Sequence, residues 1–125
     1  MTQDFRNLAT ATACLLALGS VAHADEIMDE AIAAAQPHMH HSCGSVLDSY
    51  GDDEDQVAEI VRLMAMVSLF NRQIDVMAEV PDENDRARLK DEFVEELEDA
   101  CDDDPGMLLA GAVDIAVRET FRAFD

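Results

Sequence analysis

The stretch that decides the fold is residues 53–77, DEDQVAEIVRLMAMVSLFNRQIDVM. Its apolar side chains recur at steps of three and four residues, the spacing of one helical face. Asp53 can cap the first turn, and Gln56 three residues later completes a capping-box pattern. We expect this helix to be either the centre of a bundle or partly a binding surface, because its apolar surface is wider than one stripe. The widening residues are Leu63, Met66, Leu69 and Phe70.

Four further helices are predicted from residues that typically start or end a helix. They are residues 25–36, residues 42–50, a helix that starts after Pro81-Asp82, and residues 104–124. The last of these begins with Asp-Pro, where Asp can cap a helix and Pro suits its first position. Because no strand-like alternation of useful length is present, the sequence predicts an all-α fold.

The first 24 residues have the order of a secretory signal peptide. Arg6 precedes an apolar run over residues 8–21, and an A-x-A cleavage pattern follows it. This run of roughly fourteen residues is too short to span a bilayer comfortably. We predict that residues 1–24 are removed and that residues 25–125 form one periplasmic or secreted domain. Residues 25–41 are expected to form a loosely attached N-terminal helix and linker.

Two cysteines, Cys43 and Cys101, remain in the predicted mature domain, because Cys14 lies within the signal peptide. In an oxidising compartment an even number of cysteines predicts a disulfide. The alternative is a redox or metal-binding pair, although the sequence has no C-x-x-C spacing to support it. We therefore expect a small bundle of four to five helices in which one disulfide joins these two cysteines.

Acidic residues dominate the chain, which has 28 Asp and Glu, 8 Lys and Arg, and a formal net charge of −20. Asp4 and Arg6 offset each other, so the predicted mature domain has the same net charge. Such a surface disfavours nucleic acid and anionic membranes, and it favours cations, basic partners or solubility in salt. Self-repulsion should destabilise the compact state at neutral pH, and protonation of carboxylates near about pH 4 should relieve it.

The histidines of the predicted mature domain, His38, His40 and His41, lie within four consecutive positions. Imidazole suits copper or zinc, and the thioether of Met39 would add a copper ligand. Adjacent residues cannot all face one ion in a regular helix. A flexible or capping segment and a pH-sensitive hinge are therefore the alternatives to a metal site.

No motif of enzyme catalysis is present in the sequence. It lacks G-x-S-x-G, H-E-x-x-H and a glycine-rich phosphate loop. It also lacks the C-x-x-C-H pattern that attaches haem. We expect neither enzymatic activity nor a cofactor.

A signal peptide, a small helical domain with two cysteines, and the segment Cys101-Asp102-Asp103-Asp104-Pro105 resemble the HdeA/HdeB family of periplasmic acid-stress chaperones. The C-x-x-x-P segment resembles the HdeB branch in particular, and the resemblance covers about residues 42–121. It implies a compact all-α domain in which a single disulfide joins two helices. It also implies a folded, inactive homodimer or monomer near neutral pH.

The resemblance further implies a mechanism that acid triggers. Acid would protonate carboxylates, remove ion pairs and loosen the fold, and the apolar helix faces so exposed would hold other unfolding exported proteins. The client-binding residues predicted in this way are Met64, Val67, Phe70, Val113 and Val117.

Two other functions stay open at the level of the sequence. A non-chaperone interaction or inhibitor protein, of the immunity type, would use its acidic surface to bind one basic partner. A periplasmic module for copper or zinc would use the histidines. We expect partners to be other proteins, with no nucleic acid and no membrane insertion after the signal peptide is cleaved.

Overall fold

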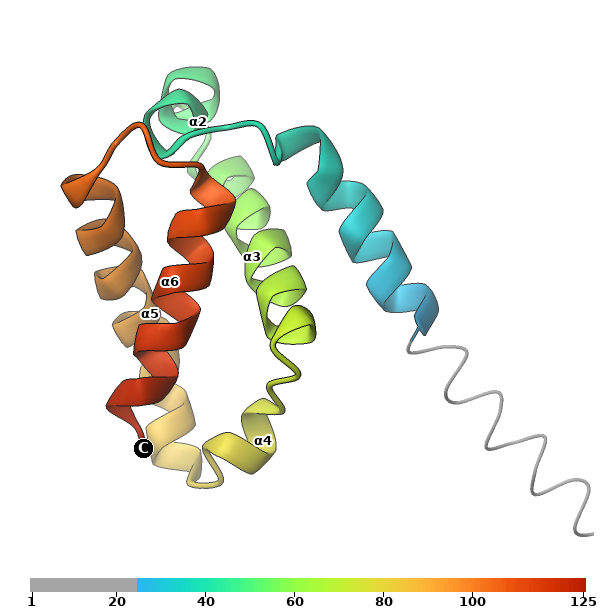
Figure 1. The fold of residues 1–125 in the computed structure, drawn as a ribbon, viewed down its shortest axis with the longest axis vertical. Helices are drawn as coiled ribbons and strands as arrows, with labels where there is room; N and C mark the ends of the chain where they lie inside the picture. The colour runs from blue at the N-terminus through green and yellow to red at the C-terminus, as the bar shows by residue number, and fades with distance from the viewer. Residues whose placement is uncertain (1–24) are drawn as a thin grey trace, which may run out of the picture.

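The computed structural model describes residues 25–125, so the signal peptide predicted at residues 1–24 lies outside the described residues. The described chain is all-α, as predicted, and it contains no strand. Figure 1 shows its helices joined by short connections. Over residues 25–125, no helix combines the length and the hydrophobicity that crossing a bilayer requires.

The first described element is a helix over residues 25–35. The elements that follow are η1 (Gln36–His38), α2 (Cys43–Tyr50), α3 (Glu54–Asn71), α4 (Val76–Glu79), α5 (Glu83–Asp103) and α6 (Leu109–Ala123). Aspartate caps begin three of them, because the side chains of Asp53, Asp75 and Asp82 accept backbone N–H groups of α3, α4 and α5. The cap predicted at Asp53 is thereby confirmed.

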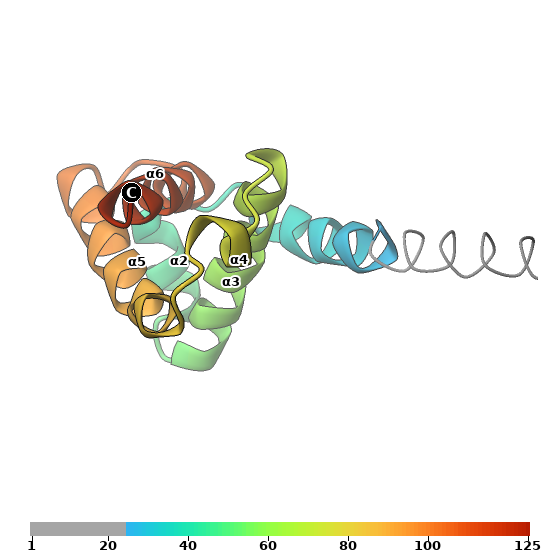
Figure 2. The same cartoon turned by 90° about the horizontal axis from the view of Figure 1, so that it is seen from below.

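The helix at the centre of the bundle is α6. It packs extensively against both α5 and α3 (Figures 1 and 2). Ala112, Val113 and Ala116 are completely buried on it. Small residues at two of these positions let the neighbouring helices approach α6 closely. Because α6 occupies the centre, α3 forms one side of the bundle.

The disulfide predicted between Cys43 and Cys101 is confirmed, and it joins α2 to α5. In the chain-entropy model, closing a loop of this length stabilises the fold by on the order of 4 kcal/mol. Backbone hydrogen bonds reinforce the same junction. The N–H of Cys43 donates to the carbonyl of Met107 at 2.9 Å, and that of Leu109 to the carbonyl of His41 at 2.8 Å.

The central helix is shorter than the apolar periodicity predicts. It ends at Asn71, and Gln73 adopts a left-handed backbone with φ 55°. Asp75 then caps a separate short helix, α4. Ile74 and Met77 continue the apolar spacing in the sequence, but they lie beyond the break and are not part of α3.

The start predicted for the last helix at Asp104-Pro105 is wrong. Asp104 ends α5, and its side chain accepts the N–H of Gly106 in a turn. The carbonyl of Pro105 accepts the N–H of Gly44, which fixes this segment beside the start of α2. These bonds hold the chain in a non-helical path until α6 begins at Leu109.

The N-terminal helix packs on α3 through a cluster that is separate from the main core. Ala31, Ala35 and Leu63 are its buried residues. In Figures 1 and 2 this helix projects from the side of the bundle beside α3. Because two of the three buried side chains are only methyl groups, the attachment is weak, on the order of a few kcal/mol.

Candidate functional site

A large groove lies between α3 and α5, and one end of α2 borders it. It has a volume of about 910 Å³, and the residues that line it come from these three helices and from Gly51, which follows α2. Its apolar wall consists of Leu47, Val57, Ala58, Val61, Ala65, Phe93, Val94 and Leu97. The groove exists because α3 and α5 each pack on α6 without packing closely on each other.

The mouth of the groove has apolar edges that water reaches. Leu47 is 59% exposed on the α2 side, and Val94 is 41% exposed on the α5 side. The charged residues of the rim are Glu54, Arg62, Lys90 and Glu98. Exposed apolar edges above an apolar wall are typical of a surface that receives an apolar segment of another molecule.

A smaller pocket of about 190 Å³ continues the groove toward α4. It shares Ala65, Lys90 and Phe93 with the groove, so the two hollows are contiguous. Together they follow α3 from Glu54 to Leu69, which spans roughly 22 Å at 1.5 Å per residue. That length accommodates an extended peptide or several helical turns.

The structure does not gather the client-binding residues predicted from the sequence. Met64, Val113 and Val117 are buried in the main core. Val67 is half-buried beside the N-terminal helix, and Phe70 is 52% exposed outside the groove. In the folded state these five residues therefore do not form one apolar surface, whereas the residues of the groove do. Its Val57, Val61, Phe93 and Leu97 belong to the predicted helical stripes, but the divergence of α3 and α5 is a tertiary property that periodicity does not reveal.

The three histidines do lie close together, in the segment that joins the N-terminal helix to α2. The ring centroids of His40 and His41 are 4.3 Å apart, and those of His38 and His41 are 6.3 Å apart. Tyr50 meets two of the rings edge-on at 5.7 and 5.8 Å. His41 is buried, and its Nδ1 lies 3.0 Å from the hydroxyl of Ser45.

This arrangement does not provide the metal site predicted at His38, His40 and His41. Among the described residues, no group of three or more His, Cys, Asp or Glu side chains is placed to hold a metal ion. Cys43 is also unavailable as a ligand, because it belongs to the disulfide. Burial lowers the pKa of His41, and the neighbouring His40 and His38 lower it further.

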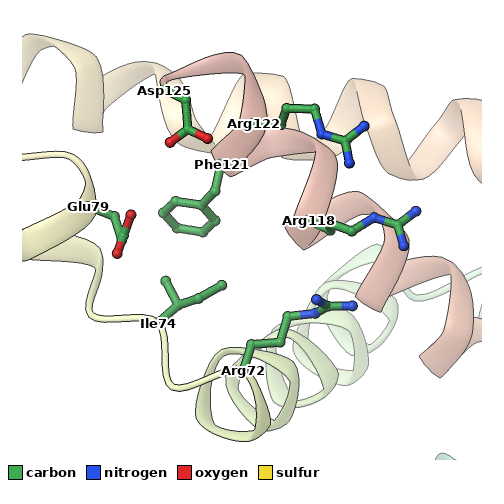
Figure 3. A pocket seen from close by; sticks show the side chains of 7 residues that line it. All are labelled: Arg72, Ile74, Glu79, Arg118, Phe121, Arg122 and Asp125. Carbon is green, nitrogen blue, oxygen red and sulfur yellow. The ribbon is translucent and has the colours of Figure 1, made fainter.

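Figure 3 shows a pocket of about 310 Å³ that contains three of the chain's arginines. Each arginine already has a carboxylate partner. Arg72 donates to both oxygens of Asp114 at 2.7 Å, and Arg118 and Arg122 donate to Glu119 at 3.2 Å. In Figure 3 the guanidinium groups of Arg118 and Arg122 point away from the aromatic ring beside the pocket. The pocket is therefore an ion-paired junction rather than a convergent anion site.

Comparison with known proteins identifies one family. Residues 35–120 match the family described as YmgD protein. A search of curated proteins found no match, and neither did a search of solved structures. The matched segment contains the histidine cluster, both disulfide cysteines and every residue of the groove. Because the match covers more than half of the chain, this protein belongs to the YmgD family.

Proposed function

We propose that this protein is an exported periplasmic chaperone that binds apolar segments of other unfolding proteins in acid. The groove between α3 and α5 is the observation that carries the proposal. It offers a wide apolar wall without any unfolding of the core. The resemblance to the HdeA/HdeB family supports the same assignment, since a disulfide-linked all-α domain is what that resemblance implies.

Acid favours such binding through the rim of the groove. Glu54 and Glu98 stand beside the apolar wall, and an apolar segment that covers an ionised carboxylate must remove its hydration at a cost. Protonation of a carboxylate removes this cost. It also reduces the repulsion within a chain whose formal net charge is −20. Binding is therefore expected to strengthen as the pH falls toward 4.

The test measures aggregation of an acid-unfolding client with the mature protein present, between pH 7 and pH 3. In the double variant Leu47→Ser/Val94→Ser, both apolar edges of the groove are removed. We expect its affinity for the client to fall about tenfold or more, because roughly 1 kcal/mol is lost at each position. Met77→Ser is the matched control, because Met77 is 62% exposed and does not line the groove.

Two results would contradict the proposal. One is a mature protein that leaves client aggregation unchanged at every pH. The other is an equal loss of protection in the double variant and in Met77→Ser, which would show that general surface hydrophobicity matters and the groove does not.

A second candidate function is the binding of one basic partner at neutral pH. The net charge of −20 on the chain favours a basic amphipathic helix whose apolar face enters the groove, although the charged residues of the rim are two acids and two bases. The two functions differ in the sign of their pH dependence. A basic partner should bind more weakly as carboxylates protonate, and its association rate should fall steeply with salt.

A further inference from the structure

The helix of residues 25–35, here called the arm, covers a second apolar surface. That surface on α3 consists of Leu63, Met66 and Val67 and is called the arm seat. Ala31 and Ala35 of the arm, one helical turn apart, are buried on it, with Met28 packed beside them. Their small size lets the arm lie close to α3, but it gives the arm little buried surface.

The histidine cluster forms the root of the arm. The titratable groups that face it are the three imidazoles themselves and, from α2, the phenol of Tyr50. On the side of α3 and α6, Asp114 lines a small pocket with Met39 and is already bound by Arg72 and Ser68. Within residues 25–125, no carboxylate forms an ion pair with these histidines.

We propose that the arm seat is a second client-binding surface, which the arm covers at neutral pH and which acid uncovers by charging the histidine cluster. The identity of the client rests on the chaperone function proposed above. The release of the arm does not depend on that function, because it is a property of the free protein.

Charging His41 favours release because its ring is buried in the packed state. The rings of His40 and His38 lie 4.3 and 6.3 Å from it, so a positive charge on either of them disfavours a positive charge on His41. His41 has a lowered pKa in the packed state, so a released imidazole with a pKa near about 6.5 takes up a proton first. The equilibrium then shifts toward release as the pH falls below about 6.5, by up to about tenfold per pH unit for one histidine.

Release also melts the arm. Isolated helices shorter than roughly 12 to 15 residues are marginal in water, and the arm is shorter than that. Once it has left α3, its amides lose their protection, and it no longer competes for the seat. The arm carries four acidic residues and no basic one, so its repulsion from the acidic bundle opposes packing and does not hold the arm in place.

The occupant of the uncovered seat is defined by what the arm presents to it. The arm offers small residues at positions i and i+4 beside a flexible methionine. A pocket of about 120 Å³, lined in part by Met39, Met64 and Val67, adjoins the seat. The client is therefore an apolar, helix-forming segment of an unfolding exported protein, with small residues on the face that meets α3.

Hydrogen exchange of the full mature protein, without a client, tests the release of the arm. Protection is compared between the arm and α6 from pH 7 to pH 4, after correction for the intrinsic pH dependence of exchange. We expect the protection of the arm to fall below about pH 6.5 while that of α6 persists. Simultaneous loss in both segments would overturn the proposal.

Two variants identify the cause. In His38→Gln/His40→Gln/His41→Gln, the loss of arm protection should move at least one pH unit lower, because the cluster no longer titrates. In Ala35→Lys, which places a charge in the buried contact, the arm should be unprotected even at pH 7. Ala34→Lys is the matched control, since Ala34 is exposed on the same helix. The proposal would be contradicted if the histidine variant lost arm protection at the same pH as the wild type. It would also be contradicted if the arm were equally protected in the two lysine variants.

A photo-crosslinking amino acid at Met66 tests the seat, with reduced carboxymethylated α-lactalbumin as a client that is unfolded at every pH. Crosslinking is expected in acid for the wild type, and already at pH 7 when Ala35→Lys is added. If the client crosslinks at Val94 but never at Met66, the seat is not a binding surface although the chaperone function stands. If it crosslinks at neither position, the proposed function fails while the exchange result still decides whether the arm is released.

Discussion

At the scale of single residues, the alanines of α6 set how closely the helices pack. Ala112 is completely buried where α6 contacts its neighbours. Ala112→Leu should lower the free energy of unfolding by about 2 kcal/mol, because the added atoms have no space to occupy. Urea unfolding measures this loss. Ala123→Leu, at the exposed end of the same helix, should have almost no effect.

Asp114 is the carboxylate whose removal should show the clearest pH dependence. Hydrogen bonds from Arg72 and, to a lesser degree, Ser68 lower its pKa in the folded state. A lowered folded pKa stabilises the protein above the unfolded value near about 3.9, and the gain is lost as the pH falls through the folded pKa. Asp114→Asn should therefore lower the Tm at pH 7 and have progressively less effect below about pH 4.

Thermal unfolding of Asp114→Asn at a series of pH values tests this expectation. Asp85→Asn, which removes the exposed pair with Arg88 on a single helix, is the control and should change the Tm little. A Tm difference between Asp114→Asn and the wild type that stays constant down to pH 2 would mean that ionisation of Asp114 contributes nothing.

At the scale of elements, local patterns in the sequence predict most helices but not where two of them end. The cap at Asp53 and the helix start after Pro81-Asp82 are predicted from the sequence and are confirmed. The left-handed residue that ends α3 is Gln73, which has no strong preference for that conformation, so the break was not predicted. Pro105 favours a helix start locally, but its carbonyl bonds to Gly44, which lies far away in the sequence.

The disulfide between α2 and α5 should contribute a large part of the stability. Reduction of the disulfide in a protein of residues 25–125 should lower the free energy of unfolding by about 4 kcal/mol, because the unfolded chain regains the entropy of an open loop. Urea titrations of the oxidised and reduced protein measure the difference. A reduced protein that unfolds at the same urea concentration would show that the hydrogen bonds at this junction suffice without the covalent link.

At the scale of the whole molecule, a moderate fall in pH from 7 should stabilise the fold. Burial raises the pKa of Glu96, and the nearby Glu92 and Glu119 raise it further. A raised carboxylate pKa means that ionisation destabilises the folded state at pH 7, and this penalty disappears as the pH falls through the raised value. Glu96→Gln should therefore raise the Tm at pH 7 and leave it unchanged at about pH 3.

Calorimetry at both pH values distinguishes this effect from a general charge effect. Glu30→Gln, which removes one exposed negative charge from the N-terminal helix, serves as the control. Stabilisation by the same amount in both variants would assign the effect to net charge rather than to the surroundings of Glu96.

The candidate site also depends on the arrangement of the whole molecule. For this reason the sequence predicted the apolar residues of the groove but not the groove itself. Val61 and Leu97 stand out as apolar residues on predicted helices. Nothing local indicates that the faces carrying them leave a groove between them. By contrast, Met64 and Val113 have the same apolar character and lie in the core, because the positions of the helices around α6 decide which stripes are covered.

The position of α6 in the chain has a consequence for synthesis. This helix is the surface on which α3 and α5 assemble, yet it follows both of them in the sequence. A chain that emerges from a ribosome or a translocation pore with its N-terminus first presents the outer helices before the helix that unites them. Until α6 has emerged, the earlier segments have no common core to collapse on. The order of the helices thus delays cooperative folding until most of the chain is free of the machinery that delivers it.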